Sequence, residues 1–372
     1  MIYLDHAATT PPYDTVYPCM TQVAAEAFGN PSSRHAAGTA ARKLLRQSRL
    51  TVAALLGVQP QEVIFTSGGT ESNNAALFSV QNSARRHIVI AATEHPSVLR
   101  AAERLERQGF SVTRVLPDAQ GRISPHSVAQ SLRRDTALLS VHAVNNETGV
   151  IQDITAMAQL AHGAGALYHC DAVQSFGHIE LPLHCADLVS LSGHKFGGPR
   201  GVGVLVVKEG VLACPLLVGG HQELSYRAGT ENLPGIAGFA LAAELVCKGL
   251  QPEFSRLETL SSLLLALLQQ SVPDLVLHSS DVLRAPGILS LQFPDVSAEE
   301  MQVRLNEVGI CVGVGAACSS ADPAPSHVLT AMGLTPKEAG ETLRISLGRT
   351  TTEEKIREAA KAMAAIYKLC RK

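Results

Sequence analysis

Short apolar, β-branched runs alternate with stretches of helical periodicity along most of the chain. The runs predict strands at residues 62–66, 87–91, 111–116, 137–143, 167–171, 188–192 and 203–208. The stretches between them predict helices at residues 36–56, 71–85, 97–108, 124–132 and 154–164. Alternation of this kind requires right-handed crossovers, so we expect an α/β fold whose seven-stranded, mostly parallel sheet is covered on both faces.

The pattern changes in the last third of the chain. Residues 234–270 form a long helical stretch that is broken at residues 249–252. Beyond it, strands are expected near residues 287–293, 310–314 and 343–347, followed by an amphipathic helix over residues 352–369. We therefore expect a large α/β domain at residues 15–252 and a smaller α+β domain at residues 253–372, with residues 1–14 packing against the smaller one.

Composition narrows the class of protein. The 46% of apolar and 17% of charged residues exclude a disordered chain. The 31 basic side chains nearly balance the 33 acidic ones, which gives no reason to expect direct binding of nucleic acid or of a membrane. The eight cysteines contain no C-x-x-C pair, so neither a zinc ribbon nor any other metal site is predicted. Because the chain starts without a signal-peptide pattern, we expect a cytoplasmic protein with reduced thiols.

Polar residues follow four of the predicted strands. They are Ser-Gly-Gly-Thr at 67–70, Glu-His at 94–95, Asp171 with Gln174, and Ser-Gly-His-Lys at 192–195. In open α/β sheets, ligands bind beyond the carboxyl ends of the strands. The four groups therefore predict a single ligand site.

The glycine-rich turn before residue 71 is compatible with phosphate binding. Gly69 allows close backbone approach, free N–H groups at a helix start attract anions, and the Thr70 hydroxyl can donate to a phosphate oxygen. An ordinary capped helix would use similar residues. The turn lacks the Gly-Lys-Ser/Thr of a Walker loop. The nearest dinucleotide-like string, at 313–318, ends in cysteine instead of glycine, which argues against a nicotinamide dehydrogenase.

Three strand-end side chains suit one cofactor. Lys195 could form a Schiff base, Asp171 could hold a pyridinium nitrogen, and the ring of His95 could stack on a flat cofactor. Taken singly, each has a simpler interpretation: a solvated lysine, a helix cap and a structural histidine. Together with Ser192 and His194 as phosphate donors, they match the needs of pyridoxal 5′-phosphate (PLP).

Several longer strings resemble group I cysteine desulfurases, the NifS/IscS-like proteins of the class-V aminotransferase family. They are YLDHAATTP at 3–11, FGNPSS at 28–33, residues 66–73, TEH at 93–95, VNNETG at 144–149, DAVQS at 171–175, SGHK at 192–195, RAGT at 227–230 and RISLGR at 344–349. The resemblance spans residues 3 to about 354 in the family's order. It implies a fold-type I PLP-dependent transferase that forms a homodimer, with the active site at the subunit interface.

The resemblance also implies roles around the cofactor ring. Lys195 would carry the Schiff base, and Asp171 would pair with the pyridinium nitrogen. Gln174 would meet the ring hydroxyl, His95 would stack on the ring, and Asn146 would lie beside it.

The same resemblance implies the remaining contacts of cofactor and substrate. The phosphate would be held by Gly69, Thr70, Ser192 and His194, and by Thr230 contributed by the other subunit. Arg344 would bind the substrate carboxylate, for which a planar guanidinium is suited. Asn30 is a further candidate for substrate contact, and Arg349 is expected to be structural.

Cys318 defines the reaction that the resemblance implies. It lies in Gly-Ala-Ala-Cys-Ser-Ser-Ala-Asp-Pro at 315–323, a small-residue segment typical of a mobile loop. A cysteine is more often a small buried hydrophobe, but the spacing from Cys318 to the Pro-Ser-His-Val-Leu string at 325–329 matches the family and implies a nucleophile. The family often has two serines where this chain has Gly313 and Val314, which changes the surroundings of the thiol.

The resulting hypothesis is a PLP-dependent cysteine desulfurase. It would convert L-cysteine to L-alanine, with Lys195 as the base, aided by His95, and would transfer sulfur to Cys318 as a persulfide. The sulfur would then pass to an acceptor protein whose identity the sequence leaves open, with iron–sulfur assembly, tRNA thiolation and DNA sulfur modification as alternatives. A selenocysteine lyase and a non-catalytic sulfur-carrier or adaptor protein are the other candidate functions.

Overall fold

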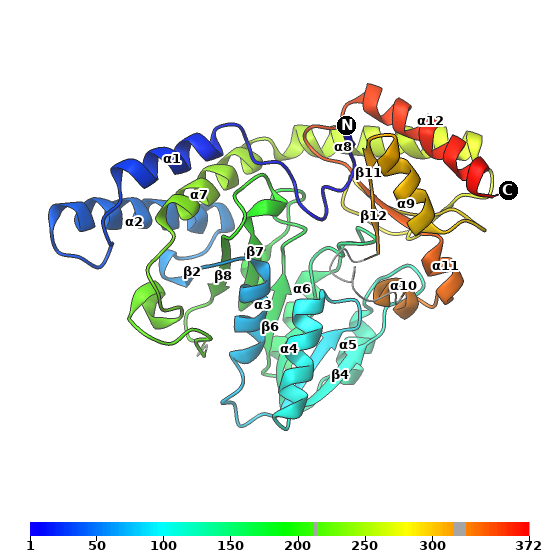
Figure 1. Ribbon diagram of the computed structural model, residues 1–372. Coiled ribbons are helices and arrows are strands. Elements are labelled where there is room, and N and C mark those ends of the chain that lie inside the picture. Colours follow the sequence, from blue (N-terminus) through cyan, green and yellow to red (C-terminus); the bar gives the residue numbers. More distant parts are fainter. Residues whose placement is uncertain (212–213, 316–324, 372) are drawn as a thin grey trace.

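The computed structural model describes residues 1–211, 214–315 and 325–371. Within these ranges the chain forms three sheets, of seven, four and two strands, and three large hydrophobic cores (Figure 1). Cys318 lies outside the described residues.

The larger sheet has seven strands, as the sequence predicts. They are β2 (Val63–Thr66), β3 (His87–Ala91), β4 (Ser111–Val115), β5 (Thr136–Ser140), β6 (Leu167–Asp171), β7 (Leu188–Ser192) and β8 (Gly203–Val207), in the spatial order β2-β8-β7-β6-β5-β3-β4. All neighbours are parallel except β8, which is antiparallel to both β2 and β7. Gly203 pairs with both Thr66 and Ser192, so the carboxyl ends of β2 and β7 meet at one edge.

Helices cover both faces of this sheet, which buries its near-continuous apolar strands (Figure 1). One core includes residues of α1 (Val16–Glu26), α2 (Ala36–Leu56), α6 (Ile154–Gly163) and α7 (Leu233–Lys248), with α5 (Pro125–Ser131) packed beside α6. The other core includes residues of α3 (Gly69–Phe78) and α4 (Pro96–Arg107). The predicted helix 71–85 is too long, because α3 ends at Phe78 and a series of turns follows.

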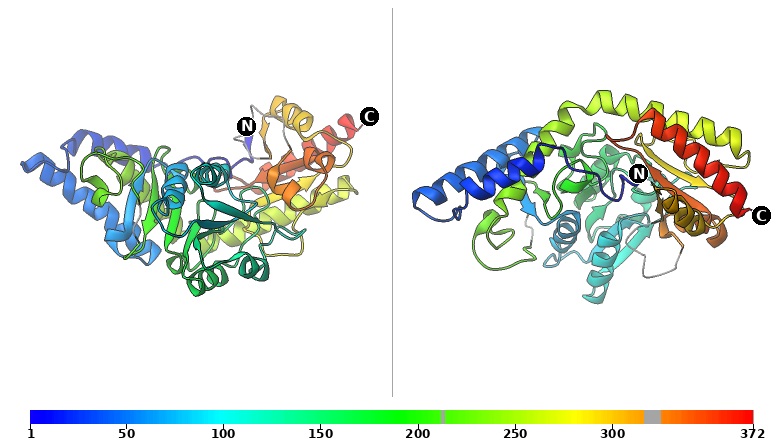
Figure 2. Two further views of the ribbon diagram at one scale, coloured as in Figure 1. Left: turned by 90° about the horizontal axis from the view of Figure 1, so that it is seen from below. Right: turned by 45° about the horizontal axis from the view of Figure 1, so that its top comes forward.

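A third core forms around an antiparallel sheet (Figure 2). Its strands are β12 (Gly313–Val314), β13 (Thr342–Ser346), β10 (Ile288–Gln292) and β9 (Val276–Leu277), in that order. Its helices are α8 (Leu250–Ser271), α9 (Ala298–Glu307) and α12 (Glu353–Cys370), and the short α10 (His327–Ala331) and α11 (Pro336–Gly340) lie nearby. The division of the chain into domains at residue 252 stays a prediction.

The chain's first residues join the core around the antiparallel sheet. β1 (Ile2–Tyr3) pairs in parallel with β11 (Ile310–Cys311), and Asp5 forms a bridge with Ser346 of β13. The single strand predicted at 310–314 is therefore wrong: β11 pairs with β1, whereas β12 pairs with β13.

The long helical stretch bends at Gly249, where α7 and α8 meet at 69°. Among the described residues, no single helix has the length and apolarity needed to cross a bilayer, although α7 and α8 pass that test as a bent pair. The helix break is narrower than predicted, because Pro252 lies within the first turn of α8, where its missing N–H costs nothing.

Candidate active site

A cavity of about 220 Å³ lies at the carboxyl edge of the larger sheet, where the sequence predicts a ligand site. Ten of the predicted site residues line it: Gly69, Thr70, His95, Asn146, Asp171, Gln174, Ser192, His194, Lys195 and Arg344. Asn30 and Thr230 are exposed and do not line it. The cavity thus brings together residues that come from strands in both sheets.

Asp171 ends β6 as a buried carboxylate that is held by two donors. Its Oδ1 accepts from the backbone N–H of Val173 at 2.9 Å, and its Oδ2 accepts from Asn73 Nδ2 at 2.7 Å. Hydrogen bonds of this kind stabilise the charged form of a buried carboxylate. Asn73 projects from α3 and also lines the cavity. The pair therefore presents a fixed negative charge to whatever binds there.

His95 is linked to Asp171 through a short polar chain. As the N-cap of α4, its Nδ1 accepts from the backbone N–H of Ser97 at 3.1 Å and lies 2.7 Å from Ser97 Oγ. Ser97 Oγ in turn accepts from Asn73 Nδ2 at 2.9 Å. Burial lowers the pKa of His95, although Asp171 opposes the shift. The imidazole is thus kept neutral and fixed in orientation.

Lys195 ends the short helix η3 (Gly193–Lys195) that follows β7. Its Nζ donates to the carbonyls of Ala7 at 2.6 Å and Ala8 at 2.9 Å, and Gln174 Nε2 donates to Ala7 at 2.8 Å. His178 Nε2 lies 3.1 Å from the carbonyl of Lys195. The N-terminal segment therefore forms one wall of the cavity, which the sequence does not indicate.

The start of α3 forms an anion cradle at one end of the cavity. Gly68 adopts φ +152°, which L side chains rarely adopt, and a Cβ on Gly69 would lie 2.9 Å from Val173 Cγ2. Backbone N–H groups at such a helix start attract anions. Burial, together with the positive charges of Lys195 and Arg200, lowers the pKa of His194 to about 4, so its neutral ring can act as a donor beside the cradle.

Arg344 lies on the opposite wall, in the middle of β13. It is buried, and it donates from Nη2 to Asp5 Oδ1 at 2.9 Å and from Nη1 to the Asn146 carbonyl at 3.3 Å. Among the described residues its Nε has no hydrogen-bond partner. Gly313 of β12 pairs with Arg344 of β13, and a Cβ atom on Gly313 would lie 3.0 Å from Arg344 Nη2. The guanidinium thus retains capacity for an incoming carboxylate.

These groups fit PLP by the chemistry of their donors. Lys195 supplies the amine, and the buried Asp171 supplies an anion for a pyridinium nitrogen. The cradle at Gly68 and Gly69 excludes larger side chains where an anion would lie, and His95 provides a flat neutral ring. Among the described residues, no group of three or more His, Cys, Asp or Glu side chains could hold a metal ion.

Comparison with known proteins identifies the family. Residues 2–358 match the model of the aminotransferase class-V family. The chain is also 40% identical over 376 residues to the cysteine desulfurase of Sinorhizobium fredii, covering 100% of this chain and 97% of that protein. The chain is a NifS/IscS-like member of the aminotransferase class-V family.

Solved structures agree with this assignment to the class-V family. A NifS-like protein superposes with a TM-score of 0.92 at 34% identity, covering 99% of both chains. SspA, solved in complex with cysteine, superposes with a TM-score of 0.80 at 33% identity, covering 93% of this chain and 99% of that one. The expected fold-type I architecture is confirmed, and PLP is the cofactor of this family, as predicted.

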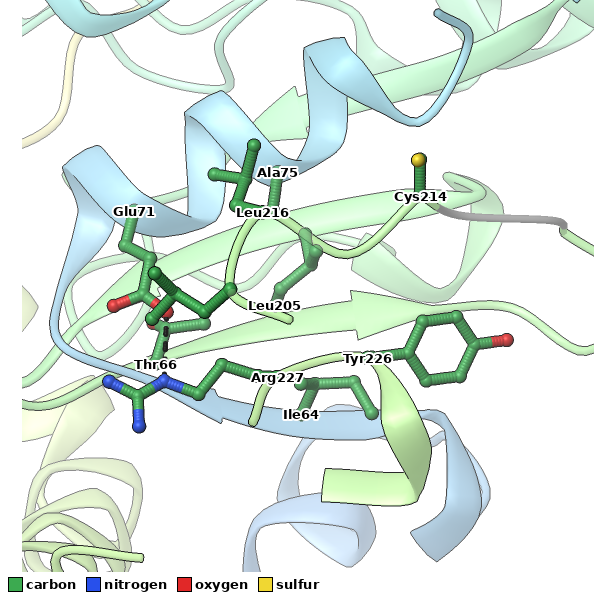
Figure 3. Close-up of a pocket in the computed structure, with 10 residues that line it drawn as sticks. Ile64, Thr66, Glu71, Ala75, Leu205, Cys214, Leu216, Tyr226 and Arg227 are labelled. Atoms are coloured by element: carbon green, nitrogen blue, oxygen red, sulfur yellow. Dashed lines mark hydrogen bonds and ion pairs between the residues drawn. The ribbon is translucent and has the colours of Figure 1, made fainter. Parts of the chain in front are cut away.

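A second, much smaller cavity of about 10 Å³ lies behind the anion cradle of this class-V protein (Figure 3). There Arg227 Nε donates to Glu71 Oε1 at 3.1 Å, while Glu71 Oε2 accepts from the backbone N–H of Ser67 at 2.8 Å. Burial would raise the pKa of Glu71, but the hydrogen bonds from Ser67 and Arg227 outweigh it and lower that pKa. Arg227 thereby fixes the exposed segment that carries Thr230 beside the start of α3.

Two polar side chains on the cavity wall were missed from the sequence. Asn73 falls inside the string at 66–73 but offers no signal of its own as the support of Asp171. His142 follows β5 and also lines the cavity. It lies two residues before the VNNETG string, and the apolar residues around it predict a core position.

Proposed function

We propose that this class-V protein is a PLP-dependent cysteine desulfurase that converts L-cysteine to L-alanine and moves the sulfur to Cys318. One observation carries the proposal. Lys195, the Asn73-supported Asp171 and Arg344 line one cavity, although they come from three elements far apart in the sequence. A protein that only carried sulfur or bound partners would need none of these groups. The relatives' names support the same activity.

The chain's own residues have distinct tasks in this reaction. When bound, PLP supplies an electron sink beside the α-carbon of an amino acid. Asp171 would hold the positive ring nitrogen, and Arg344 would orient the substrate carboxylate through a guanidinium that Asp5 and Asn146 already position. Lys195 Nζ would take the proton from the α-carbon. His95, a neutral imidazole on the cavity wall, would lie against the ring and assist that proton transfer.

Cys318 completes the sulfur chemistry. Its thiolate attacks the sulfur of the substrate, the carbon–sulfur bond of the substrate breaks, and a sulfur–sulfur bond forms on Cys318. L-Cysteine and one thiol become L-alanine and one persulfide, so no external oxidant or reductant is needed. The proposal for Cys318 rests on the family resemblance and on the relatives, since this residue lies outside the described ranges. An acceptor protein then receives the sulfur, for which we propose a cytoplasmic setting.

A homodimer is the proposed assembly. Exposed apolar side chains occur in the turn before α2 and in the segment after β8, including Phe28 at 79% and Val218 at 83% exposure, as well as Leu217 and Leu224. Such side chains mark surfaces that other chains cover. Thr230 lies in the same segment and does not line its own cavity. We therefore assign it to the phosphate end of the other subunit's site.

The test compares wild type with Cys318→Ala and Lys195→Ala. After L-cysteine is added, wild type should produce alanine and a protein-bound persulfide. Cys318→Ala should bind PLP with an unchanged visible spectrum and form no persulfide, whereas Lys195→Ala should lose alanine formation altogether. A Cys318→Ala protein that desulfurates cysteine at the wild-type rate would overturn the role of that thiol. Turnover of selenocysteine but not of cysteine would show a selenocysteine lyase instead.

A further inference from the structure

A buried acid and a buried histidine face each other behind the wall of the cavity. Glu94, just beyond the carboxyl end of β3, is 0% exposed, and its Oε1 accepts from Ser140 Oγ at 3.1 Å. Its Oε2 lies 3.5 Å from His142 Nδ1, which is an ion-pair distance but too long for a good hydrogen bond. His142 is 4% exposed and lines the cavity. The pair therefore connects the sheet interior with the ligand site.

The side chains behind Glu94 form a chain of hydrogen bonds through the sheet. Ser140 Oγ lies 2.9 Å from His169 Nδ1, and His169 Nε2 lies 3.0 Å from Ser190 Oγ, so the polar chain crosses β5, β6 and β7. Burial lowers the pKa of His169 to about 4, which keeps its ring neutral. Among the described residues, the ion pair formed by Glu94 is with His142.

Both ring nitrogens of His142 lack a hydrogen-bond partner among the described residues. A neutral imidazole carries its proton on one ring nitrogen, and an imidazolium carries a proton on each. With a proton on Nε2, His142 is a hydrogen-bond donor at that atom.

That donor lacks a hydrogen-bond partner in the part of the chain that the structure describes. His142 Nε2 is buried and makes no hydrogen bond within the described residues. The other charged or titratable groups on the cavity wall are His95, Asp171, His194, Lys195 and Arg344. His142 follows the strand next to Asp171, and the backbone N–H of the adjacent Ala143 donates to the Asp171 carbonyl at 2.9 Å. An apolar side chain would fill this place without leaving a polar atom unsatisfied.

We propose that His142 is a positioning residue of this site, which donates a hydrogen bond from Nε2 to an acceptor oxygen of the ligand bound beside Asp171. This inference rests on the proposed function, because PLP and the amino-acid carboxylate are the two sources of such an oxygen. Glu94 lies on the other side of the ring, with its Oε2 3.5 Å from Nδ1. The contact with the ligand would compensate for the unfavourable burial of the imidazole.

Two variants of His142 separate this role from a structural one. His142→Met keeps the volume and removes the donor, whereas His142→Gln keeps an N–H near the position of Nε2. The apo His142→Met protein should melt at the same or a higher temperature than apo wild type, because an unsatisfied polar group has been removed. Its dissociation constant for PLP, or for L-alanine in the PLP-loaded protein, should rise by about three- to tenfold, the loss of one hydrogen bond. His142→Gln should bind PLP within about twofold of wild type.

The two sources of the oxygen are distinguished by titration of PLP into apo protein and of L-alanine into PLP-loaded protein. A weaker PLP complex assigns the acceptor to the cofactor, and a weaker L-alanine complex with unchanged PLP binding assigns it to the substrate carboxylate. Unchanged binding of both, no recovery in His142→Gln, or a less stable apo His142→Met protein would overturn the inference. If wild type fails to bind PLP at all, the proposed function fails as well, so the two failures are told apart in the wild-type titration.

Discussion

Asn73 determines how Asp171 is presented to the cofactor. Its Nδ2 donates to the Asp171 carboxylate at 2.7 Å and to Ser97 Oγ at 2.9 Å. One side chain therefore orients both the Asp171 carboxylate and the hydroxyl group that contacts His95. We expect Asn73→Ala to weaken PLP binding by about tenfold or more, because hydrogen bonds to charged groups are worth about 1.5–3 kcal/mol. Titration of apo protein with PLP measures this effect. The exposed Asn82 provides the matched control, and equal affinities of Asn73→Ala and Asn82→Ala would contradict the role.

Single residues differ in how far the sequence could predict them. Lys195, Asp171 and Arg344 were predicted because each stands in a string that resembles the family, and the structure places all three on one cavity. Asn73 and His142 were not predicted, because their importance comes from neighbours that only folding supplies: Asp171 is 98 residues from Asn73, and Glu94 reaches His142 from another strand end. A buried imidazole in an apolar run, such as His142 between Val141 and Ala143, resembles a core position in sequence.

At the scale of elements, β5, β6 and β7 are joined by a polar chain inside an apolar sheet. His169, in the middle of β6, is fully buried between Ser140 and Ser190. Its pKa of about 4 in the folded protein lies below the ordinary value of 6.5. Between these pH values the unfolded chain binds more protons than the folded one. The contribution of His169 to the free energy of unfolding is therefore fully present above pH 6.5 and decreases as the pH falls toward 4.

The contribution of His169 can be measured as a slope. We expect the free energy of unfolding of wild type to fall between pH 6.5 and pH 4.5, and to fall less steeply in His169→Asn, whose amide does not titrate. Denaturant unfolding at a series of pH values gives both curves. His126, which is exposed, serves as the control, and His126→Asn should reproduce the wild-type slope. The same slope in His169→Asn and wild type would show that other groups cause the loss.

The elements themselves were predictable where their periodicity is strong. All seven strands of the larger sheet, and helices such as α2 and α12, lie within a few residues of the sequence-predicted ranges. The antiparallel direction of β8 was not predictable, because the hydrophobic pattern of a strand does not indicate which strands it pairs with. For the same reason residues 310–314 were read as one strand, whereas Val312 separates two short strands that pair with different neighbours. The short helices α10 and α11 offer too few residues for a period to emerge.

At the scale of the whole molecule, the larger sheet and the antiparallel sheet both contribute residues to one cavity. The N-terminal segment brings Ala7 and Ala8 to Lys195 while Asp5 of the same segment holds Arg344, so a short stretch of chain positions groups from both sheets. Arg227 attaches its segment to Glu71, in the first turn of the helix whose start forms the anion cradle (Figure 3). That segment also carries the exposed Leu217, Val218 and Leu224, so the proposed dimer surface and the phosphate end of the site are adjacent.

Subunit mixing tests whether Thr230 serves the partner's site. Thr230→Ala alone should weaken PLP binding by about three- to tenfold, the loss of one hydrogen bond. A dimer of one Lys195→Ala and one Thr230→Ala protomer has one site that combines an intact Lys195 with an intact Thr230 from the other chain. Co-expression with two different tags isolates this mixed dimer. If Thr230 acts across the interface, half of its sites should bind PLP with wild-type affinity and turn over L-cysteine. If Thr230 acts within its own chain, the site with the intact Lys195 contains the Thr230→Ala substitution. The mixed dimer should then bind PLP with the weaker affinity of the Thr230→Ala protein.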